Sequence, residues 1–190
     1  MPVSEDFLAF LDTETGGVTP GKDPVIEIAT ILTDHQFHEI DRIEMKVQLR
    51  PGDVVQPEAA RVNGYTPEAW AKEARPFGEW KAWLSRRVPY GSVAIPVGHN
   101  VGFDRDMIDL GYYKPQFCPL SYRKIDTLTL AMCLRLSGSI HVADVKLGTV
   151  AKALGIEHAN AHGAMSDALA AKGIFELALQ SFLATRVMTK

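Results

Sequence analysis

Short apolar runs separated by polar turns characterise the first fifty residues of the chain. The run over residues 7–11 is bounded by acidic residues and is too short for a helix, which is typical of a buried strand. Residues 25–33 are rich in β-branched side chains, and residues 40–49 alternate in part before Pro51 and Gly52. These three runs predict strands joined by short links, in an antiparallel meander.

Helical spacing dominates the rest of the chain, apart from an apolar run over residues 93–97 that predicts another strand. Trp80 and Trp83 lie on the apolar face of a helix predicted over residues 77–87, which indicates core packing. Phe103, Met107 and Leu110 mark one face of the helix that follows the strand. Further helices are predicted over residues 127–136, 147–154 and 166–184. Early strands and late helices predict a mixed α/β fold with helices packed on a central sheet.

The composition fits one domain over residues 1–190. The chain has 46% hydrophobic residues and no fixed-period repeat or linker. Twenty basic and 23 acidic residues give a net charge of −3, which argues against binding nucleic acid by bulk positive charge alone.

Cysteine usage and the absence of a targeting pattern bear on where the chain works. Cys118 and Cys133 have no CxxC spacing and no nearby histidine pair, so neither a zinc site nor a disulfide framework is indicated. The N-terminus lacks a basic segment followed by an apolar one, and no window approaches the roughly 20 apolar residues of a membrane helix. We expect a cytoplasmic protein that is neither exported nor membrane-bound.

Two acids at the end of the first predicted strand are the first candidate for chemistry. Asp12 and Glu14 are two residues apart, so on an extended chain their side chains leave the same face. Carboxylates that close repel each other unless a cation lies between them, and oxygen ligands suit Mg²⁺ or Mn²⁺. A solvated acidic loop is the more common explanation of such a triplet taken alone.

Two later motifs extend this candidate. Asp104 opens a predicted helix, where an isolated acid is most often explained by the helix dipole. His162 and Asp167 are five residues apart, which on one continuous helix would separate them by roughly 140°. They share a site only if His162 precedes the helix, and Gly163 permits that break.

The order of these three motifs resembles the DEDDh group of 3′-to-5′ exonucleases, which has a ribonuclease H-like fold and includes the proofreading subunit of bacterial DNA polymerase III. The resemblance covers roughly residues 7 to 180 and includes the segments 57–59 and 62–64. It implies a mixed five-stranded sheet whose first three strands are antiparallel. It also implies four metal-binding acids and a catalytic histidine, at Asp12, Glu14, Asp104, Asp167 and His162.

The mechanism that the resemblance implies uses two Mg²⁺ or Mn²⁺ ions. Two metal ions about 3.5 to 4 Å apart stabilise the attacking and leaving oxygens of an in-line displacement. Asp12 would bridge the ions, and His162 would take a proton from the attacking water. The product would be a nucleoside 5′-monophosphate. Without the four proposed ligands the formal net charge of the remainder is +1, so the acidity no longer argues against phosphate substrates.

Substrate contacts are predicted at five further positions. Backbone N–H groups around Thr13 and Thr15 would meet the terminal sugar, and Asn63 and Asn100 match family positions near the substrate. Phe103 would stack on a base, although its helical spacing fits core packing equally well.

The expected substrate is a single-stranded or frayed 3′ end, with DNA preferred over RNA. The alternatives are an exoribonuclease that acts on RNA ends or short oligoribonucleotides, and a non-catalytic module that binds nucleic acid or a polymerase. A polymerase or a second copy of the chain is a possible partner in either case.

Two other motifs predict no function. Residues 16–22 match the G-x-x-x-x-G-K pattern of a phosphate-binding loop, but Asp23 stands where Ser or Thr is needed and a β-rich run follows. His35 and His38 lie in a polar turn with no visible third ligand, so an exposed turn is expected rather than a metal site.

Overall fold

The computed structural model describes residues 4–112, 118–159 and 162–187. Within them, five strands form one mixed sheet in the order β3-β2-β1-β4-β5. The pairs β1–β2 and β2–β3 are antiparallel, and β1–β4 and β4–β5 are parallel. This arrangement confirms the predicted fold class. The strands are β1 (Ser4–Thr15), β2 (Val25–Asp34), β3 (Glu39–Lys46), β4 (Ser92–Gly98) and β5 (Ile125–Asp126).

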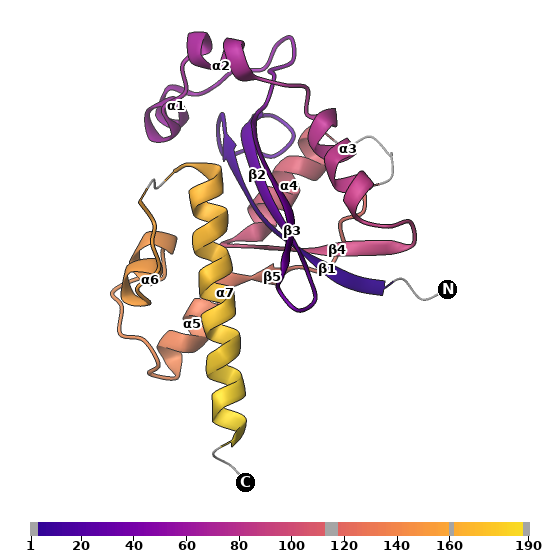
Figure 1. Cartoon of the computed structure of the whole chain (residues 1–190). Helices are drawn as coiled ribbons and strands as arrows, with labels where there is room; N and C mark the ends of the chain where they lie inside the picture. Colours follow the sequence, from indigo (N-terminus) through magenta and orange to yellow (C-terminus); the bar gives the residue numbers. More distant parts are fainter. Residues whose placement is uncertain (1–3, 113–117, 160–161, 188–190) are drawn as a thin grey trace.

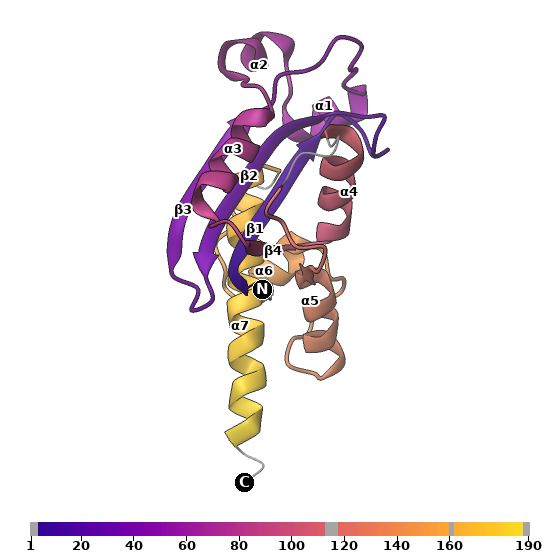
Figure 2. The ribbon, with the colours of Figure 1, turned by 90° about the vertical axis from the view of Figure 1, so that its right-hand side faces the viewer.

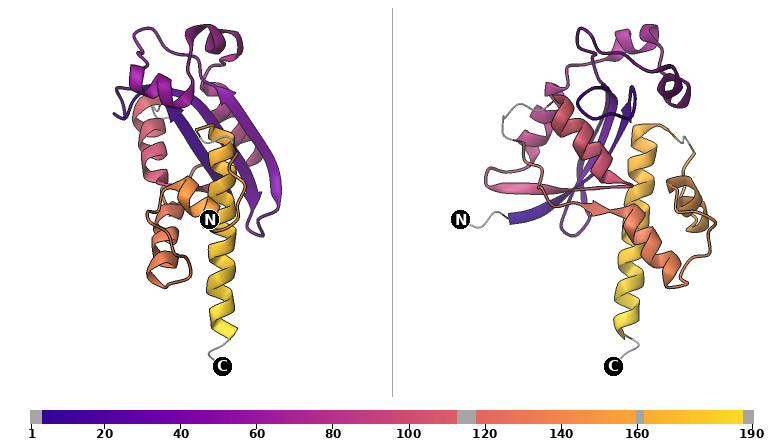
Figure 3. Two further views of the ribbon diagram at one scale, coloured as in Figure 1. Left: turned by 90° about the vertical axis from the view of Figure 1, so that its left-hand side faces the viewer. Right: turned by 180° about the vertical axis from the view of Figure 1, so that it is seen from behind.

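Helices cover both faces of this sheet (Figures 1 and 2). The long helix α7 crosses one face, while α3 and α4 lie on the other. Helices α5 and α6 pack beside α7, and α1 and α2 lie together near the end of β1 (Figure 3). The helices are α1 (Pro57–Asn63), α2 (Pro67–Glu73), α3 (Gly78–Arg87), α4 (Val101–Tyr112), α5 (Thr127–Leu136), α6 (Leu147–Ala153) and α7 (Ala164–Val187).

Strand β1 is central and buried on both faces, which explains its nearly continuous apolar sequence. Leu8 and Phe10 pack with Ala168 and Phe175 of α7. The alternate residue Leu11 packs in the core on the opposite face, which also contains residues of α3 and α4. Because side chains alternate along a strand, Asp12 and Glu14 continue the α7 face.

Several predicted features needed correction. Helices α1 and α2 were not predicted. Each has seven residues, α1 has no buried residue and α2 has only Trp70, so neither shows an apolar face with helical spacing. Strand β3 ends at Lys46, three residues before the predicted Leu49. Leu110 is 66% exposed, so it does not belong to the buried face of α4.

Two other expectations, on Trp80 and Trp83 and on the loop before β2, agree with the structure. Trp80 and Trp83 are buried, as predicted for the core. Asp23 accepts a hydrogen bond from the N–H of Thr19, and strand β2 follows the loop, as expected for a segment that is not a phosphate-binding loop. No helix in the described part of the chain has the length and apolarity to span a membrane.

Candidate active site

The candidate site lies at the carboxyl end of β1, where the topology brings three elements together. Strand β4 runs parallel to β1, so the two carboxyl ends meet at one edge, and α4 begins directly after β4. From β1 the chain forms β2 and β3 on one side of the sheet and later β4 and β5 on the other side. Open α/β sheets commonly bind ligands at such a switch point. The sequence therefore places Asp12 and Glu14 on β1 next to the first turn of α4, which carries Asp104.

Asp104 is 4% exposed and is held by β1. Its Oδ1 accepts hydrogen bonds from the backbone N–H of Thr13 at 2.9 Å and from the Thr13 hydroxyl at 2.7 Å. The first turn of a helix also favours a negative charge. Asp104 is thus fixed in orientation by a residue that lies between the two acids of β1.

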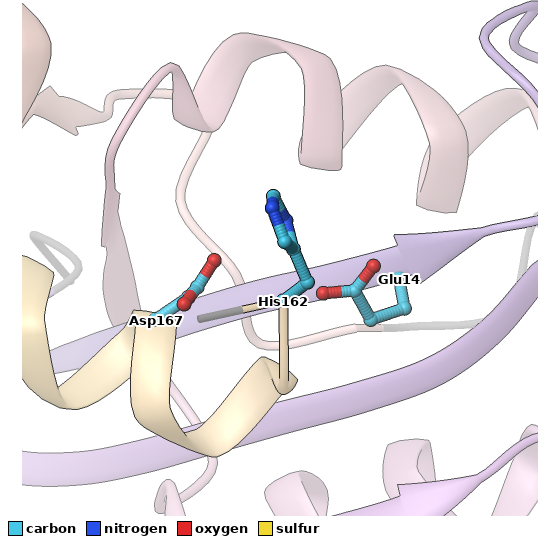
Figure 4. Close-up of side chains that lie close together, drawn as sticks. All are labelled: Glu14, His162 and Asp167. Carbon is cyan, nitrogen blue, oxygen red and sulfur yellow. The ribbon is translucent and has the colours of Figure 1, made fainter. Parts of the chain in front are cut away.

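His162, Glu14 and Asp167 come together from separate elements (Figure 4). Each offers one ligand atom, and these atoms lie within 4.8 Å of one another. Asp167 lies in the first turn of α7, whereas His162 precedes that helix with a φ of 67°. The left-handed backbone at His162 turns its side chain toward the carboxylates, so the predicted break before the helix is present.

Burial raises the pKa values of three carboxyls at the end of β1 and the start of α4, those of Asp12, Glu14 and Asp104. Burial raises the pKa of Glu14 to about 8, with a further contribution from the charge of Asp167. Burial raises the pKa of Asp104 to about 7, although the two hydrogen bonds from Thr13 oppose that increase. The pKa of Asp12 is raised by burial and then by its carboxylate neighbours. Such a cluster holds excess negative charge that only protons or cations can neutralise.

Glu27 is an acid of the site region that the sequence reasoning missed. It is the β2 partner of Glu14 across the antiparallel pair, so the two side chains share a face. Its negative charge raises the pKa of Glu14. Burial, followed by the charge of Glu44, raises the pKa of Glu27 itself. A glutamate within the otherwise apolar run 25–33 was the signal that could have identified it.

His158 is a second residue that the sequence reasoning missed. Its Nε2 lies 2.6 Å from Oδ1 of Asp167, and the His158 side chain is 11% exposed. The spacing of four residues between His158 and His162 was the available signal, but a loop gives no periodicity from which to place it.

Two open cavities flank the candidate site. The first, here called the Glu14 cavity, has a volume of about 560 Å³ and is lined by residues that include Glu14, Thr15, Lys22, Val62 and Asn63. The second, here called the His162 cavity, has a volume of about 630 Å³ and is lined by residues that include His99, Lys146, His158, His162 and Asp167. Volumes of 300–1,000 Å³ are usual for ligand sites.

The Glu14 cavity contains two of the five predicted substrate contacts, Thr15 and Asn63. The Asn63 side-chain amide donates to the carbonyl of Thr15 at 3.1 Å, so it also holds α1 against the end of β1. The backbone N–H of Thr13 donates to Oδ1 of Asp104 at 2.9 Å, and its contact with the terminal sugar stays a prediction.

The other two predicted contacts line neither cavity. Phe103 is partly buried against the core formed with α3, as its helical spacing allowed. Asn100 has a φ of 69°, and its backbone N–H donates to Asp126 at 2.9 Å. Asp126 also accepts from the N–H of Leu128 and caps α5.

The sequence from residue 9 to residue 175 matches the RNase_T family, described as exonuclease. The chain belongs to this exonuclease family. The predicted resemblance to DEDDh exonucleases is confirmed.

Two similar proteins are longer than this chain. Exodeoxyribonuclease I of Escherichia coli strain K12 is 30% identical over 85% of this chain, which spans 37% of that protein. The PolC-type DNA polymerase III of Staphylococcus aureus is 29% identical over 86% of this chain, which spans 11% of that protein. The chain therefore corresponds to about two fifths or less of these relatives.

Solved structures of exonuclease I share the fold. The zinc-bound complex of E. coli exonuclease I with single-stranded DNA has a TM-score of 0.75 and 26% sequence identity, with 98% of this chain and 42% of that chain covered. The complex of the E. coli enzyme with a dT13 oligonucleotide has a TM-score of 0.74 and 25% identity, with 97% and 43% covered.

The donor set at the end of β1 fits divalent cations. Carboxylate oxygens are the ligands that hard cations such as Mg²⁺ and Mn²⁺ prefer, and a bound cation would stabilise the charged forms that burial disfavours at Asp12, Glu14 and Asp104. His162 adds a nitrogen within reach of Glu14 and Asp167. The exonuclease fold is of the kind that requires divalent metal ions, and this donor set fits such ions.

Proposed function

We propose that this chain is a metal-dependent 3′-to-5′ exonuclease that hydrolyses phosphodiester bonds at 3′ ends of DNA, preferably single-stranded, and releases nucleoside 5′-monophosphates. The observation that carries this proposal is the meeting of Glu14, His162 and Asp167 at the end of β1, beside an open cavity. Family membership and the similarity to exodeoxyribonuclease I support the same reaction.

The four acids Asp12, Glu14, Asp104 and Asp167 would hold the divalent cations, Mg²⁺ or Mn²⁺. When bound, such ions stabilise the attacking and leaving oxygens of a phosphodiester displacement as Lewis acids. The chain supplies rigid placement of these ligands, because Thr13 orients Asp104 and the first turn of α7 carries Asp167. Preorganised ligands reduce the cost of reorganisation during the reaction.

His162 would act as the general base. It is exposed, so water reaches its ring, and it stands beside two of the carboxylates. A ring nitrogen would take the proton of the attacking water, with the neighbouring negative charges stabilising the imidazolium that forms. A positioned base of this kind typically contributes 10²–10⁴-fold to the rate.

The Glu14 cavity would receive the terminal nucleotide. Val18 and Val62 give it apolar walls, and Thr15 and Asn63 place polar groups near the carboxylates. The lining contains Lys22 together with the acids Glu14, Asp23 and Glu58, so a polyanionic substrate would depend on bound divalent cations to offset the acids. DNA is preferred over RNA because exodeoxyribonuclease I and a DNA polymerase are among the relatives. The similarity to the PolC-type polymerase also makes a polymerase a candidate partner.

The test uses 5′-labelled single-stranded DNA and RNA of one sequence, with Mg²⁺, Mn²⁺ or EDTA. We expect a metal-dependent ladder that shortens from the 3′ end of DNA and is lost in Asp12→Ala. A ladder with RNA alone would overturn the DNA preference. If wild type leaves both substrates intact with either metal, the exonuclease proposal is wrong and a binding module replaces it.

A further inference from the structure

His158 is a polar residue next to the site, and the proposed reaction assigns it no role. It lies in the segment between α6 and α7, and its Nε2 contacts Oδ1 of Asp167 at 2.6 Å. Both side chains are largely buried, at 11% and 15% exposure. This contact is shorter than the two hydrogen bonds that Thr13 donates to Asp104, another candidate metal ligand.

The ring of His158 is also held from its other side. A Cβ at Gly148 of α6 would lie 3.5 Å from Nδ1 of His158, so the ring stands against the backbone of that helix. The imidazole therefore lies between α6 and the first turn of α7. Packing on one side and a hydrogen bond on the other fix the direction in which the ring presents Nε2.

A second proton-transfer residue is the obvious alternative role, and the geometry argues against it. His162 is exposed and lies within reach of both Glu14 and Asp167, whereas His158 is largely buried and its Nε2 is already committed to a carboxylate oxygen. A committed and buried ring does not reach an attacking water. It does restrict the carboxylate that it contacts.

The consequence for Asp167 follows from the geometry of a carboxylate. With Oδ1 engaged by His158, rotation of the carboxyl group is restricted and Oδ2 keeps one direction. Partners that orient metal ligands in this way typically contribute 10–100-fold to metal affinity or activity. We propose that His158 is a positioning residue that fixes Asp167 for divalent-cation binding through its Nε2–H. This inference rests on the proposed metal site.

The test compares two variants of His158 whose side-chain amides place a hydrogen-bond donor at different distances from the backbone. In His158→Gln the side-chain NH₂ reaches the position of Nε2, whereas in His158→Asn it reaches only the position of Nδ1. Mn²⁺ affinity is measured by calorimetry without nucleic acid, and folding is checked by the thermal midpoint in EDTA. His141→Asn, at an exposed histidine that lines neither cavity, is the matched control.

We expect His158→Asn to bind Mn²⁺ about 10–100-fold more weakly than wild type, in the range typical of such partners. His158→Gln should restore most of the affinity, and His141→Asn should match wild type. In nuclease assays His158→Asn should need more metal but approach the wild-type kcat when metal is saturating. Equal Mn²⁺ affinity of His158→Asn and wild type would overturn the proposal. It would also be overturned if His158→Asn and His158→Gln lost Mn²⁺ affinity to the same extent.

The same measurements separate this inference from the proposed function. If wild type binds Mn²⁺ and the two amides differ as expected, but neither DNA nor RNA is degraded, the exonuclease proposal fails while the role of His158 stands. If wild type degrades DNA and His158→Asn binds Mn²⁺ normally, the role of His158 alone is wrong.

Discussion

Both hydrogen-bond donors of Thr13 converge on one oxygen of Asp104, although the two residues are 91 positions apart in the sequence. The contact joins the central strand to the first turn of α4, between the two acids of β1. A carboxylate that accepts bonds on one oxygen keeps a fixed orientation, and these bonds also favour its charged form. Thr13 therefore both places Asp104 and opposes the increase in its pKa that burial causes.

Thr13→Val, which is close in shape, should weaken metal binding by removing the hydroxyl donor. Hydrogen bonds to charged groups contribute about 1.5–3 kcal/mol, which corresponds to a loss of roughly tenfold or more in Mn²⁺ affinity. Calorimetric titration of the variant with Mn²⁺ measures this loss. Thr13→Ser keeps the hydroxyl and should bind within a few-fold of wild type. Unchanged affinity in the valine variant would mean that the backbone N–H alone orients Asp104.

In the absence of metal, the stability of the folded chain should decrease from about pH 5 to pH 8. The folded-state pKa values of Glu14 and Asp104, about 8 and about 7, lie above their ordinary values of 4.5 and 3.8. Between the ordinary and the raised values the folded chain binds more protons than the unfolded chain, so its stability is lost as pH rises. Thermal midpoints measured in EDTA across this range give the slope.

Glu14→Gln provides the control for this pH dependence. The amide cannot ionise, so its thermal midpoint at pH 8 in EDTA should exceed that of wild type and its slope with pH should be smaller. Each 1 kcal/mol of stabilisation raises the midpoint by about 2–4 °C in a chain of this size. Mn²⁺ should stabilise wild type more than the variant. A wild-type midpoint that rises between pH 5 and pH 8 would contradict the assignment.

His162 combines a catalytic assignment with a strained backbone. A non-glycine residue in the left-handed region costs about 1–2 kcal/mol, and the φ of His162 is 67°. His162→Ala keeps that strain and should lower kcat by about 10²–10⁴-fold, as expected for loss of a general base. Kinetics at saturating metal measure kcat, and a normal Mn²⁺ affinity shows that the carboxylates are intact.

His162→Gly should be equally inactive but at least as stable as His162→Ala. Glycine relieves the backbone strain, and this gain exceeds the 0.4–1 kcal/mol that its greater freedom in the unfolded chain typically costs. Comparison of thermal midpoints decides the sign. A glycine variant that is clearly less stable than the alanine variant would show that the backbone at position 162 relaxes once the imidazole is removed.

The resemblance to DEDDh exonucleases implied that the four acids and His162 form one site, and short-range geometry was compatible with it. Strand alternation places Asp12 and Glu14 on one face, and helical periodicity requires His162 to precede α7 if it is to meet Asp167. His158 and Glu27 were missed for different reasons. The first lies in a loop without periodicity, and the second is a polar residue within a strand identified by its apolar neighbours.

In helix α4, the acid Asp104 interrupts the apolar pattern from which the buried face would be predicted. Its buried positions include Asp104, Met107 and Ile108, which share one face at i, i+3 and i+4. A search for apolar residues alone passes over Asp104 and selects Phe103, Met107 and Leu110 instead. Leu110 then proves to be exposed. The buried stripe includes an acid because its first turn faces the site, whereas Met107 and Ile108 pack in the core.

Asn63 should affect substrate binding more than chemistry, because it contacts the wall of the Glu14 cavity and no candidate ligand. Its amide donates to the carbonyl of Thr15, and its Oδ1 accepts from the N–H of Tyr65. Asn63→Asp keeps the acceptor and removes the donor, so α1 should separate from the end of β1. We expect KM for a DNA oligonucleotide to rise about tenfold, the equivalent of 1.4 kcal/mol, with a smaller change in kcat. A fall in kcat at unchanged KM would contradict this assignment.

Gly98 and Gly111 should respond to alanine with opposite signs. A Cβ at Gly98 would lie 2.7 Å from the carbonyl oxygen of Leu11, so Gly98→Ala forces β4 away from β1 just before the turn into α4. Overpacking of this kind typically costs 1–3 kcal/mol, or roughly 2–12 °C in the thermal midpoint.

Gly111, within α4, has nothing within 4 Å of an added Cβ, so Gly111→Ala should stabilise the chain by up to about 1 kcal/mol. Because the β1–β4 contact places Asp104 beside Asp12, Gly98→Ala should also weaken Mn²⁺ binding, whereas Gly111→Ala should leave it unchanged. Equal midpoints for the two variants would show that the strands absorb the added methyl group without separating.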